Sequence, residues 1–374
     1  MVSAIENCDN ESQLSTFKMN SSEDDDINFI KNELLPELVY ERCFCDVGSR
    51  EFVEYDSACV KSLNNEKGPT NNESYYSANI IVKFSGEPKT FSIFIKLLPA
   101  TVNDIAYDWF LNEEIFYNSH LLRKSNTKCV PKCYAVSMGK YGRPTLVLED
   151  LNAQGFEKIR KLNLEELNLC ASAIGFFHES ILKYVREKNC SLNNFSTLKN
   201  MESNQIFCKG YSRIKTLIDS KILKKIKNIV GEDIRENLQS TVVKEQKILC
   251  HGHFSRENLL FKYENGKAVD VKAIRWHTIK YNSIGMDLAF LILENLSNEM
   301  GDIDGILTRY LKALKSGDLE NERNSLSLTE VRSAFVSNLL HAYFTLSLDE
   351  DCSDEKIVAL SEQLERLGAF NEIQ

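Results

Sequence analysis

The sequence predicts a two-lobed protein of the α+β class, with a β-rich front and a mostly helical back. Alternating apolar residues, which are typical of strands, concentrate between residues 79 and 148, whereas helical periodicity dominates after residue 151. A short pair of strands interrupts the helical part between residues 258 and 274. A chain of 374 residues is longer than a single hydrophobic core usually stabilises, so we expect two lobes.

The first lobe is expected to follow a loose leader. Residues 1–24 are rich in Ser, Asn and acidic residues and carry no helical or strand pattern. Asp25 or Asp26 then resembles a helix N-cap before a run of apolar residues at helical spacing. Pro36 falls inside that run, and we expect it to kink the helix or to end its first part.

A hairpin and a helix follow within residues 25–150, which we assign to the first lobe. Ile80, Val82 and Phe84 alternate with less apolar residues, the stretch 85–88 resembles a turn, and the alternation resumes through residue 95. Lys96 lies on the opposite strand face to Ile95. A helix is predicted over residues 103–122, and a strand over residues 145–148.

The second lobe, residues 151–374, is predicted to be mainly helical. The stretches 164–184 and 328–346 both show strong helical periodicity. Between them, residues 258–263 and 269–274 are predicted to form two strands joined by a turn at residues 264–266.

Composition excludes several classes of function. Hydrophobic residues make up 43% of the chain and charged residues 26%, which is typical of a globular protein. The net charge of −9 leads us to expect neither a nucleic acid nor a membrane as a partner. The first residues lack a signal-peptide pattern, and the odd number of 11 cysteines favours reduced thiols, so we expect a cytoplasmic protein.

The densest signal for function lies at residues 250–261. Kinases place an aspartate in a short loop to accept the proton of the substrate hydroxyl, and an asparagine five residues later to hold magnesium. The segment resembles the H-G-D-x-x-x-x-N catalytic loop of the choline-kinase and aminoglycoside-phosphotransferase superfamily. His251, Gly252 and Asn258 match this pattern, whereas His253 stands where the aspartate is expected.

A second segment fits the same superfamily. Residues 274–276 resemble the I-D-W end of a strand whose aspartate binds magnesium, and Arg275 occupies the place of that aspartate. Residues 287–289 resemble the D-L-A helix start that follows. The resemblance implies that Asp287 has a structural role and bonds backbone groups of the catalytic loop.

Four further matches point to the ecdysteroid-kinase-like (CHK-kinase-like) branch found in arthropods. Residues 93–99 resemble its strand with the phosphate-anchoring lysine, here Lys96, and residues 114–117 its helix with the paired glutamate, here Glu114. Residues 148–151, with Glu149 and Leu151, resemble its hinge, and residues 177–178 its helical Phe-His pair. Gly68 and residues 74–77 stand where the branch has its nucleotide loop.

The resemblance covers roughly residues 27–350 and implies a bilobal protein-kinase-like fold. It implies that Lys96, Glu114, Glu149 and Leu151 bind the cofactor, and that His253, Asn258 and Arg275 occupy the catalytic and metal positions. The active proteins of this branch phosphorylate hydroxyls of small molecules, ecdysteroids among them, with ATP and magnesium.

The two substitutions change the charge and the ligands of the site. Replacing two carboxylates by a neutral imidazole and a guanidinium shifts the charge by about +3, and neither group supplies the hard oxygen ligand that magnesium requires. An imidazole can act as a general base near neutral pH, and such help contributes about 10²–10⁴ in rate. Loss of the ion, in contrast, removes the main stabiliser of the transferring charge.

Three functional hypotheses remain open on the sequence. The first is a pseudokinase that binds a small molecule, a nucleotide such as ATP, or a protein partner, without magnesium. The second is an active phosphotransferase in which His253 serves as the base and Arg275 contacts the phosphates. The third, in a different class, is a zinc site formed by Cys250, His251, His253 and His277, since thiolate and imidazole suit that ion. We assign no other metal site.

Overall fold

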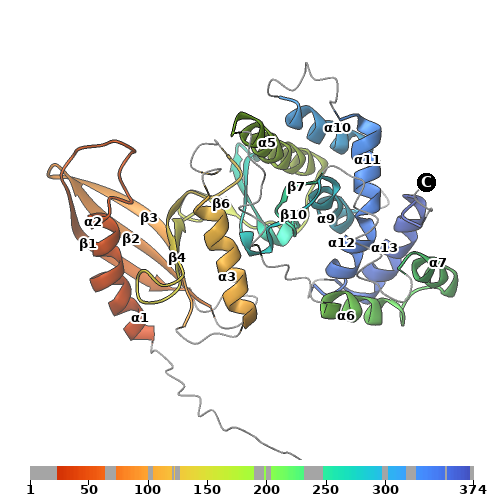
Figure 1. Ribbon diagram of the computed structural model, residues 1–374, viewed down its shortest axis with the longest axis horizontal. Coiled ribbons are helices and arrows are strands. Elements are labelled where there is room, and N and C mark those ends of the chain that lie inside the picture. Colours follow the sequence, from red (N-terminus) through yellow and green to blue (C-terminus); the bar gives the residue numbers. More distant parts are fainter. Residues whose placement is uncertain are drawn as a thin grey trace, which may run out of the picture.

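The computed structural model contains a β-sheet lobe and a helical lobe that meet along the helix α3 (Figure 1). This arrangement confirms the bilobal α+β class. The structure describes residues 23–63, 73–99, 104–119, 122, 127–188, 198, 204–230, 247–296, 302–316, 326–349 and 352–370. Gly68 and residues 1–22 lie outside this range.

The first lobe is built on one antiparallel sheet of strand order β1-β2-β3-β5-β4. The strands span Val53–Ser62 (β1), Ser74–Phe84 (β2), Glu87–Leu97 (β3), Cys133–Ser137 (β4) and Thr145–Glu149 (β5). Ser85 and Gly86 both have positive φ, which is the backbone of a tight hairpin turn between β2 and β3. The predicted hairpin is therefore present, with Ser74 opposite Leu97.

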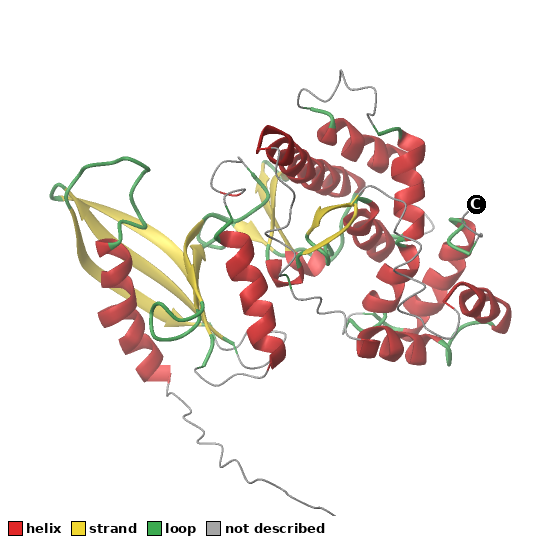
Figure 2. Cartoon of the chain, in the orientation of Figure 1, coloured by secondary structure: helices red, strands yellow, loops and turns green. Residues whose placement is uncertain are grey.

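Two helical segments flank this sheet (Figure 2). On one face α1 (Glu23–Phe29), a π-helical turn (Ile30–Leu34) and α2 (Leu35–Tyr40) pack their apolar residues against Ile80, Val82 and Ile95. The predicted N-cap was wrong: the helix begins at Glu23, so Asp25 and Asp26 lie in its first turn, where carboxylates interact favourably with the helix dipole. Pro36 lies in the first turn of α2, directly after the π-helical irregularity.

On the other face lies α3 (Asp104–Tyr117), which is shorter than the predicted span of 103–122. Its residues Phe110 and Phe116 belong to a large core that continues into the second lobe. Phe116 stacks on Trp276 at a centroid distance of 4.4 Å. The helix therefore connects the sheet directly to the segment after Arg275.

The second lobe packs helices around α9 (Gly285–Asn295), whose first nine residues are all buried. Around it lie α5 (Leu164–Lys188), α11 (Leu328–Ser337) and α12 (Leu339–Leu346), and α10 (Ile303–Leu314) packs on α5 and α11. The described part of this lobe also contains α6 (Asn204–Ile214), α7 (Ser220–Val230) and α13 (Asp354–Arg366). Gly285 contacts α11 so closely that a Cβ would lie 1.9 Å from the Ala334 carbonyl oxygen.

The stretch 328–346, whose periodicity predicts helical structure, forms two helices. Asn338 separates α11 from α12, and its side-chain amide donates to the carbonyl oxygen of Ala334 at 2.8 Å. Asparagine competes for backbone hydrogen bonds in this way, and the apolar periodicity alone does not reveal the break.

Two small sheets carry the loops of the second lobe. One joins β6 (Phe156–Glu157), β8 (Leu259–Glu264) and β9 (Lys267–Ala273), and the other joins β7 (Lys247–Cys250) with β10 (Lys280–Ser283). Asn265 and Gly266 have positive φ between β8 and β9, where the sequence predicts a turn. Across the described residues, none of the helices combines the length and apolar character that crossing a bilayer requires.

Candidate functional site

A cavity of about 330 Å³ lies between the sheet of the first lobe and the small strands of the second. Its walls are largely apolar and include Phe94, Leu146, Leu148, Leu260 and Ile274. Charged side chains gather at other parts of the lining: Glu73, Lys96, Glu113, Glu149, Asp150, Glu157, Lys158 and Arg275. An apolar slot with a few charged groups is typical of a small-molecule site.

Lys96 forms a buried triad at the bottom of this cavity. Its Nζ lies 2.8 Å from Glu113 Oε2 and 2.8 Å from Glu73 Oε1, and all three side chains are nearly inaccessible. Burial lowers the pKa of Lys96, but the two carboxylates outweigh burial and hold this pKa above its ordinary value. The lysine is therefore a cation between two carboxyl groups, and burial raises the pKa of one of them, Glu113, against the attraction of Lys96.

The predicted pairing of Lys96 with Glu114 was wrong by one residue. Glu113 faces the lysine, and Glu114 lies about 100° further round α3, where Oε1 accepts the backbone N–H of Met138 at 2.9 Å. A motif match locates a helix turn but does not determine which of two adjacent glutamates faces the sheet.

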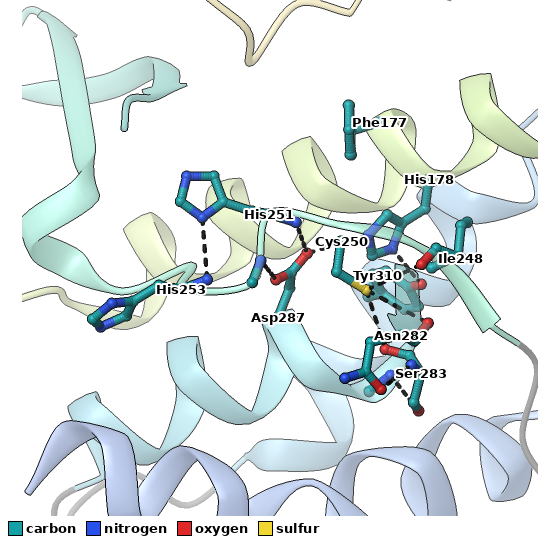
Figure 3. A network of polar contacts seen from close by, with 12 residues as sticks. Phe177, His178, Ile248, Cys250, His251, His253, Asn282, Ser283, Asp287 and Tyr310 are labelled. Atoms are coloured by element: carbon teal, nitrogen blue, oxygen red, sulfur yellow. Dashed lines mark hydrogen bonds and ion pairs between the residues drawn. The ribbon is translucent and has the colours of Figure 1, made fainter. Parts of the chain in front are cut away.

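The loop after β7 is held by one carboxylate (Figure 3). Asp287 accepts the backbone N–H groups of His251 and Gly252, both at 2.9 Å, and its Oδ2 lies 3.3 Å from His178 Nε2. Burial raises the pKa of Asp287, but His178 and the backbone donors outweigh burial and lower it. The structural role expected for Asp287 is confirmed by these contacts.

His251 also holds this loop. Its Nε2 lies 2.9 Å from the carbonyl oxygen of Ile274, directly before Arg275. Burial lowers the pKa of His251 to about 4, so the ring is neutral at physiological pH. The loop and the end of β9 are thus joined at the position where the two aspartates are expected.

His253 extends away from this junction. Figure 3 shows its imidazole directed away from Asp287 and from the ring of His251. Its Nε2 lies 3.7 Å from Glu257 Oε1 and 3.8 Å from Asp349 Oδ2. Among the described residues, those that line the 330 Å³ cavity do not include His253.

Asn258 and Arg275 face each other. Asn258 Nδ2 donates to the carbonyl oxygen of His253 at 2.9 Å, and Arg275 Nη1 lies 3.5 Å from Asn258 Oδ1. Arg275 also lines the cavity and adopts φ +61°, ψ +53°, a left-handed backbone that costs a non-glycine residue about 1–3 kcal/mol. The structure therefore brings Lys96, Asn258 and Arg275 to one end of the cavity region.

His277 is neutral in this environment. Burial, and then the positive charges of Lys96 and Arg275, lower its pKa well below the ordinary value. Its ring stacks on Trp109 at 4.6 Å. His277 therefore adds no positive charge to those of Lys96 and Arg275.

The hinge-like residues Glu149 and Leu151 also line the cavity. Leu151 packs with Phe156 and Leu260. The carboxylate of Glu149 accepts the backbone N–H of Lys132 at 2.9 Å and lies 3.4 Å from Lys272 Nζ. Its charge is therefore already compensated by the protein.

The zinc hypothesis was wrong in its choice of ligands. Cys250 Sγ groups with His178 and Asp287, and His253 Nε2 groups with Glu257 and Asp349; within each group the ligand atoms lie within 4.8 Å of one another. His277 instead stacks on Trp109. Burial raises the pKa of Cys250 well above its ordinary value, so the thiol is protonated and a poor ligand.

Sequence reasoning missed Glu73 and Asp349. Glu73 precedes Ser74, which pairs with Leu97, so the hairpin register would have indicated that Glu73 lies near Lys96. Asp349 is separated from His253 by almost one hundred residues, and no local pattern in the sequence connects the two.

Known structures show limited likeness to this chain. A choline kinase from Cryptosporidium parvum is 15% identical with a TM-score of 0.47, and covers 83% of this chain and 88% of its own. An ethanolamine kinase from Plasmodium vivax is 12% identical (TM-score 0.44, 82% and 80% covered). The GDP complex of aminoglycoside 2'-phosphotransferase-IIIa is 13% identical (TM-score 0.42, 91% and 99% covered).

Comparison of the sequence with protein families gives a clearer relationship than the solved structures do. None of the curated protein sequences matches this chain significantly. The sequence model of the ecdysteroid kinase-like family, however, matches residues 72–321, which include strands β2 to β5 of the first sheet, the Lys96 triad, the Asp287-held loop and Arg275. Because this match covers well over half of the 374 residues, the chain belongs to the ecdysteroid kinase-like family.

Proposed function

We propose that this protein is a pseudokinase of its family. It binds a nucleotide or another small molecule in the 330 Å³ cavity, and it transfers a phosphoryl group very slowly or not at all. The observation that carries this proposal is the 3.5 Å approach of the Arg275 guanidinium to Asn258 Oδ1. In the superfamily that this chain resembles, the residues at these two positions bind magnesium. In this chain one of the two, Arg275, carries a positive charge.

The cavity suits a nucleotide better than it suits magnesium. Its apolar walls fit a flat ring, and Lys96 and Arg275 are cations of the kind that bind phosphate oxygens. Magnesium, in contrast, is held by carboxylate and phosphate oxygens, and a guanidinium beside Asn258 repels it. ATP bound in this way would lack the ion that stabilises the transferring charge.

The position of His253 also supports an inactive protein. A general base must come within about 3.2 Å of the proton it accepts, directly or through one water. The imidazole faces Glu257 and Asp349 and does not line the cavity described above. An altered route with His253 as the base would therefore require the ring to turn.

Thermal unfolding of the purified protein with ATP tests this proposal. A ligand that binds only the folded state stabilises it by about 2.7 kcal/mol at a hundredfold excess over Kd. We expect ATP to raise the unfolding midpoint equally with magnesium and with EDTA. Stabilisation that requires magnesium, together with phosphoryl transfer to an ecdysteroid or another alcohol, would favour the active enzyme instead.

The double variant His253→Asp/Arg275→Asp sharpens the test. We expect it to acquire magnesium-dependent nucleotide binding, because it restores two carboxylates at the expected positions. Arg309→Asp, on the exposed surface of α10, makes an arginine-to-aspartate change away from the cavity and serves as the control. If the double variant gains no magnesium dependence, the assignment of positions 253 and 275 is wrong.

A further inference from the structure

Three side chains with metal-ligating atoms meet outside the nucleotide-like cavity. His253 comes from the loop after β7, Glu257 from the 3-10 turn that follows it (Arg256–Asn258), and Asp349 from the segment after α12. Their ligand atoms lie within 4.8 Å of one another, with His253 Nε2 at 3.7 Å from Glu257 Oε1 and 3.8 Å from Asp349 Oδ2. Asp349 is almost one hundred residues away from His253 and Glu257 in the sequence, yet its carboxylate faces the same imidazole.

The imidazole nitrogen is buried without a hydrogen-bond partner in the described structure. Nε2 of His253 is inaccessible, although 16% of the side chain remains exposed. The ring packs on Phe290 at 4.9 Å, and the loop backbone at this residue is held by Asn258. A buried polar atom without a hydrogen bond is costly, so an atom placed like this points to a ligand that completes it.

The chemistry of the three groups suits a divalent transition-metal ion. Zinc binds imidazole nitrogen at about 2.0–2.1 Å and carboxylate oxygen at about 2.0–2.2 Å, so tetrahedral ligand atoms stand about 3.3–3.5 Å apart. The two separations from His253 Nε2, 3.7 and 3.8 Å, exceed this by a few tenths of an ångström, and the two carboxylates lie within 4.8 Å of each other. Small side-chain rotations can close these gaps. Burial lowers the pKa of His253, but Asp349 and Glu257 outweigh burial and raise it. The ion replaces the imidazole proton, and the two carboxylates balance its charge.

We propose that His253, Glu257 and Asp349 bind a divalent transition-metal ion, with Zn²⁺ as the representative, and leave a fourth position to water. Magnesium is a poor occupant because it prefers oxygen ligands in octahedral geometry. The site differs from the zinc set considered on the sequence, since only His253 is common to both. It does not depend on the proposed pseudokinase activity, because none of the three residues lines the cavity.

Cobalt and zinc titrations of the full chain, stripped of metal with a chelator, test the site in the absence of nucleotide. We expect one Co²⁺ per chain with the visible absorption of a four- or five-coordinate ion, displaced by Zn²⁺ and not by millimolar Mg²⁺. His253→Ala and Asp349→Asn should each weaken Zn²⁺ binding at least tenfold in calorimetry, and Glu257→Gln, at a partly exposed position, should also weaken it.

Asp354→Asn is the matched control. It removes a carboxylate charge close to Asp349 in the sequence, but Asp354 is exposed and pairs with Arg213. We expect it to bind Zn²⁺ as the unmodified chain does. The proposal is overturned if no stoichiometric binding occurs, or if all three ligand variants retain it. An intense sulfur-to-cobalt band would also overturn it, because it would place the ion on cysteines such as Cys59 or Cys208.

Discussion

The Glu73 carboxylate lies 2.8 Å from the Lys96 ammonium, at the end of the cavity where Arg275 also stands. Glu113 holds the same ammonium from α3 at an equal distance. In the kinase-like resemblance this lysine anchors phosphate, so an anion already occupies one side of it. Glu73 therefore competes with the phosphates of any nucleotide that enters the cavity.

Replacing Glu73 should strengthen nucleotide binding. In Glu73→Gln the carboxylate is lost, and Lys96 is free to contact a phosphate with only Glu113 opposing it. We expect the Kd for ATP, measured by calorimetry with EDTA, to fall by about tenfold, which corresponds to about 1.4 kcal/mol.

A second glutamate provides the control for that variant. Glu157 lines the same cavity but is exposed and makes no ion pair with Lys96. Glu157→Gln should leave the affinity for ATP nearly unchanged. Equal or weaker binding by Glu73→Gln would show that Glu73 does not compete with the phosphates.

Lys96 should matter for stability as well as for binding. Lys96→Met leaves two buried carboxylates, Glu73 and Glu113, without their shared cation. Removing one partner of a buried ion pair typically costs about 3–5 kcal/mol. Urea unfolding should show a loss of this size, whereas Lys83→Met, which breaks the exposed pair with Asp56, should show little change. A small loss in Lys96→Met would contradict the buried triad.

Asp287→Asn should loosen the loop that carries His253. The amide offers only one acceptor oxygen, so either His251 or Gly252 loses its buried N–H partner. We expect the free energy of unfolding to fall by about 2–4 kcal/mol. The control is Asp304→Asn in the exposed pair with Arg332, which should unfold close to the unmodified chain. Hydrogen exchange at His251 and Gly252 should rise only in the Asp287 variant.

Lys280 should make stability increase with pH. Burial lowers the pKa of this amine from 10.5 to about 7, against the opposing attraction of Asp287. Between these two values the unfolded chain binds a proton that the folded chain does not, so the free energy of unfolding rises with pH. Urea unfolding at pH 7, 8 and 9 should show this rise.

The Lys280→Met variant isolates that contribution. It removes the amine, so the rise between pH 7 and 9 should flatten and the stability at pH 7 should increase. Lys312→Met on the exposed face of α10 should keep the slope of the unmodified chain. If Lys280→Met retains the full slope, the amine is not the group responsible.

The sequence predicts local features of this fold well. The β2–β3 hairpin has its turn at Ser85 and Gly86, and the β8–β9 hairpin at Asn265 and Gly266, because turn chemistry is written in a few adjacent residues. The sequence did not reveal the break at Asn338, because it depends on a hydrogen bond from one side chain. It also did not reveal the start of α1, because acidic residues in a first turn interact with the helix dipole and leave no periodic pattern.

The site is predictable only in part for a related reason. Residues that each lie in a short local motif, such as Lys96 and Arg275, line the cavity. The choice between Glu113 and Glu114 depends on the rotation of α3 against the sheet, and the approach of Asp349 to His253 depends on how α12 packs on α9. Both are tertiary relationships that no local spacing encodes.

Asp287 shapes its loop through backbone N–H groups, which every residue except proline possesses. The path of the chain at positions 251 and 252 is thus insensitive to which side chain stands at position 253. The geometry of this loop therefore does not depend on the chemistry of the side chain at position 253. Evolution can replace the reactive groups of such a fold while the backbone of the loop stays the same.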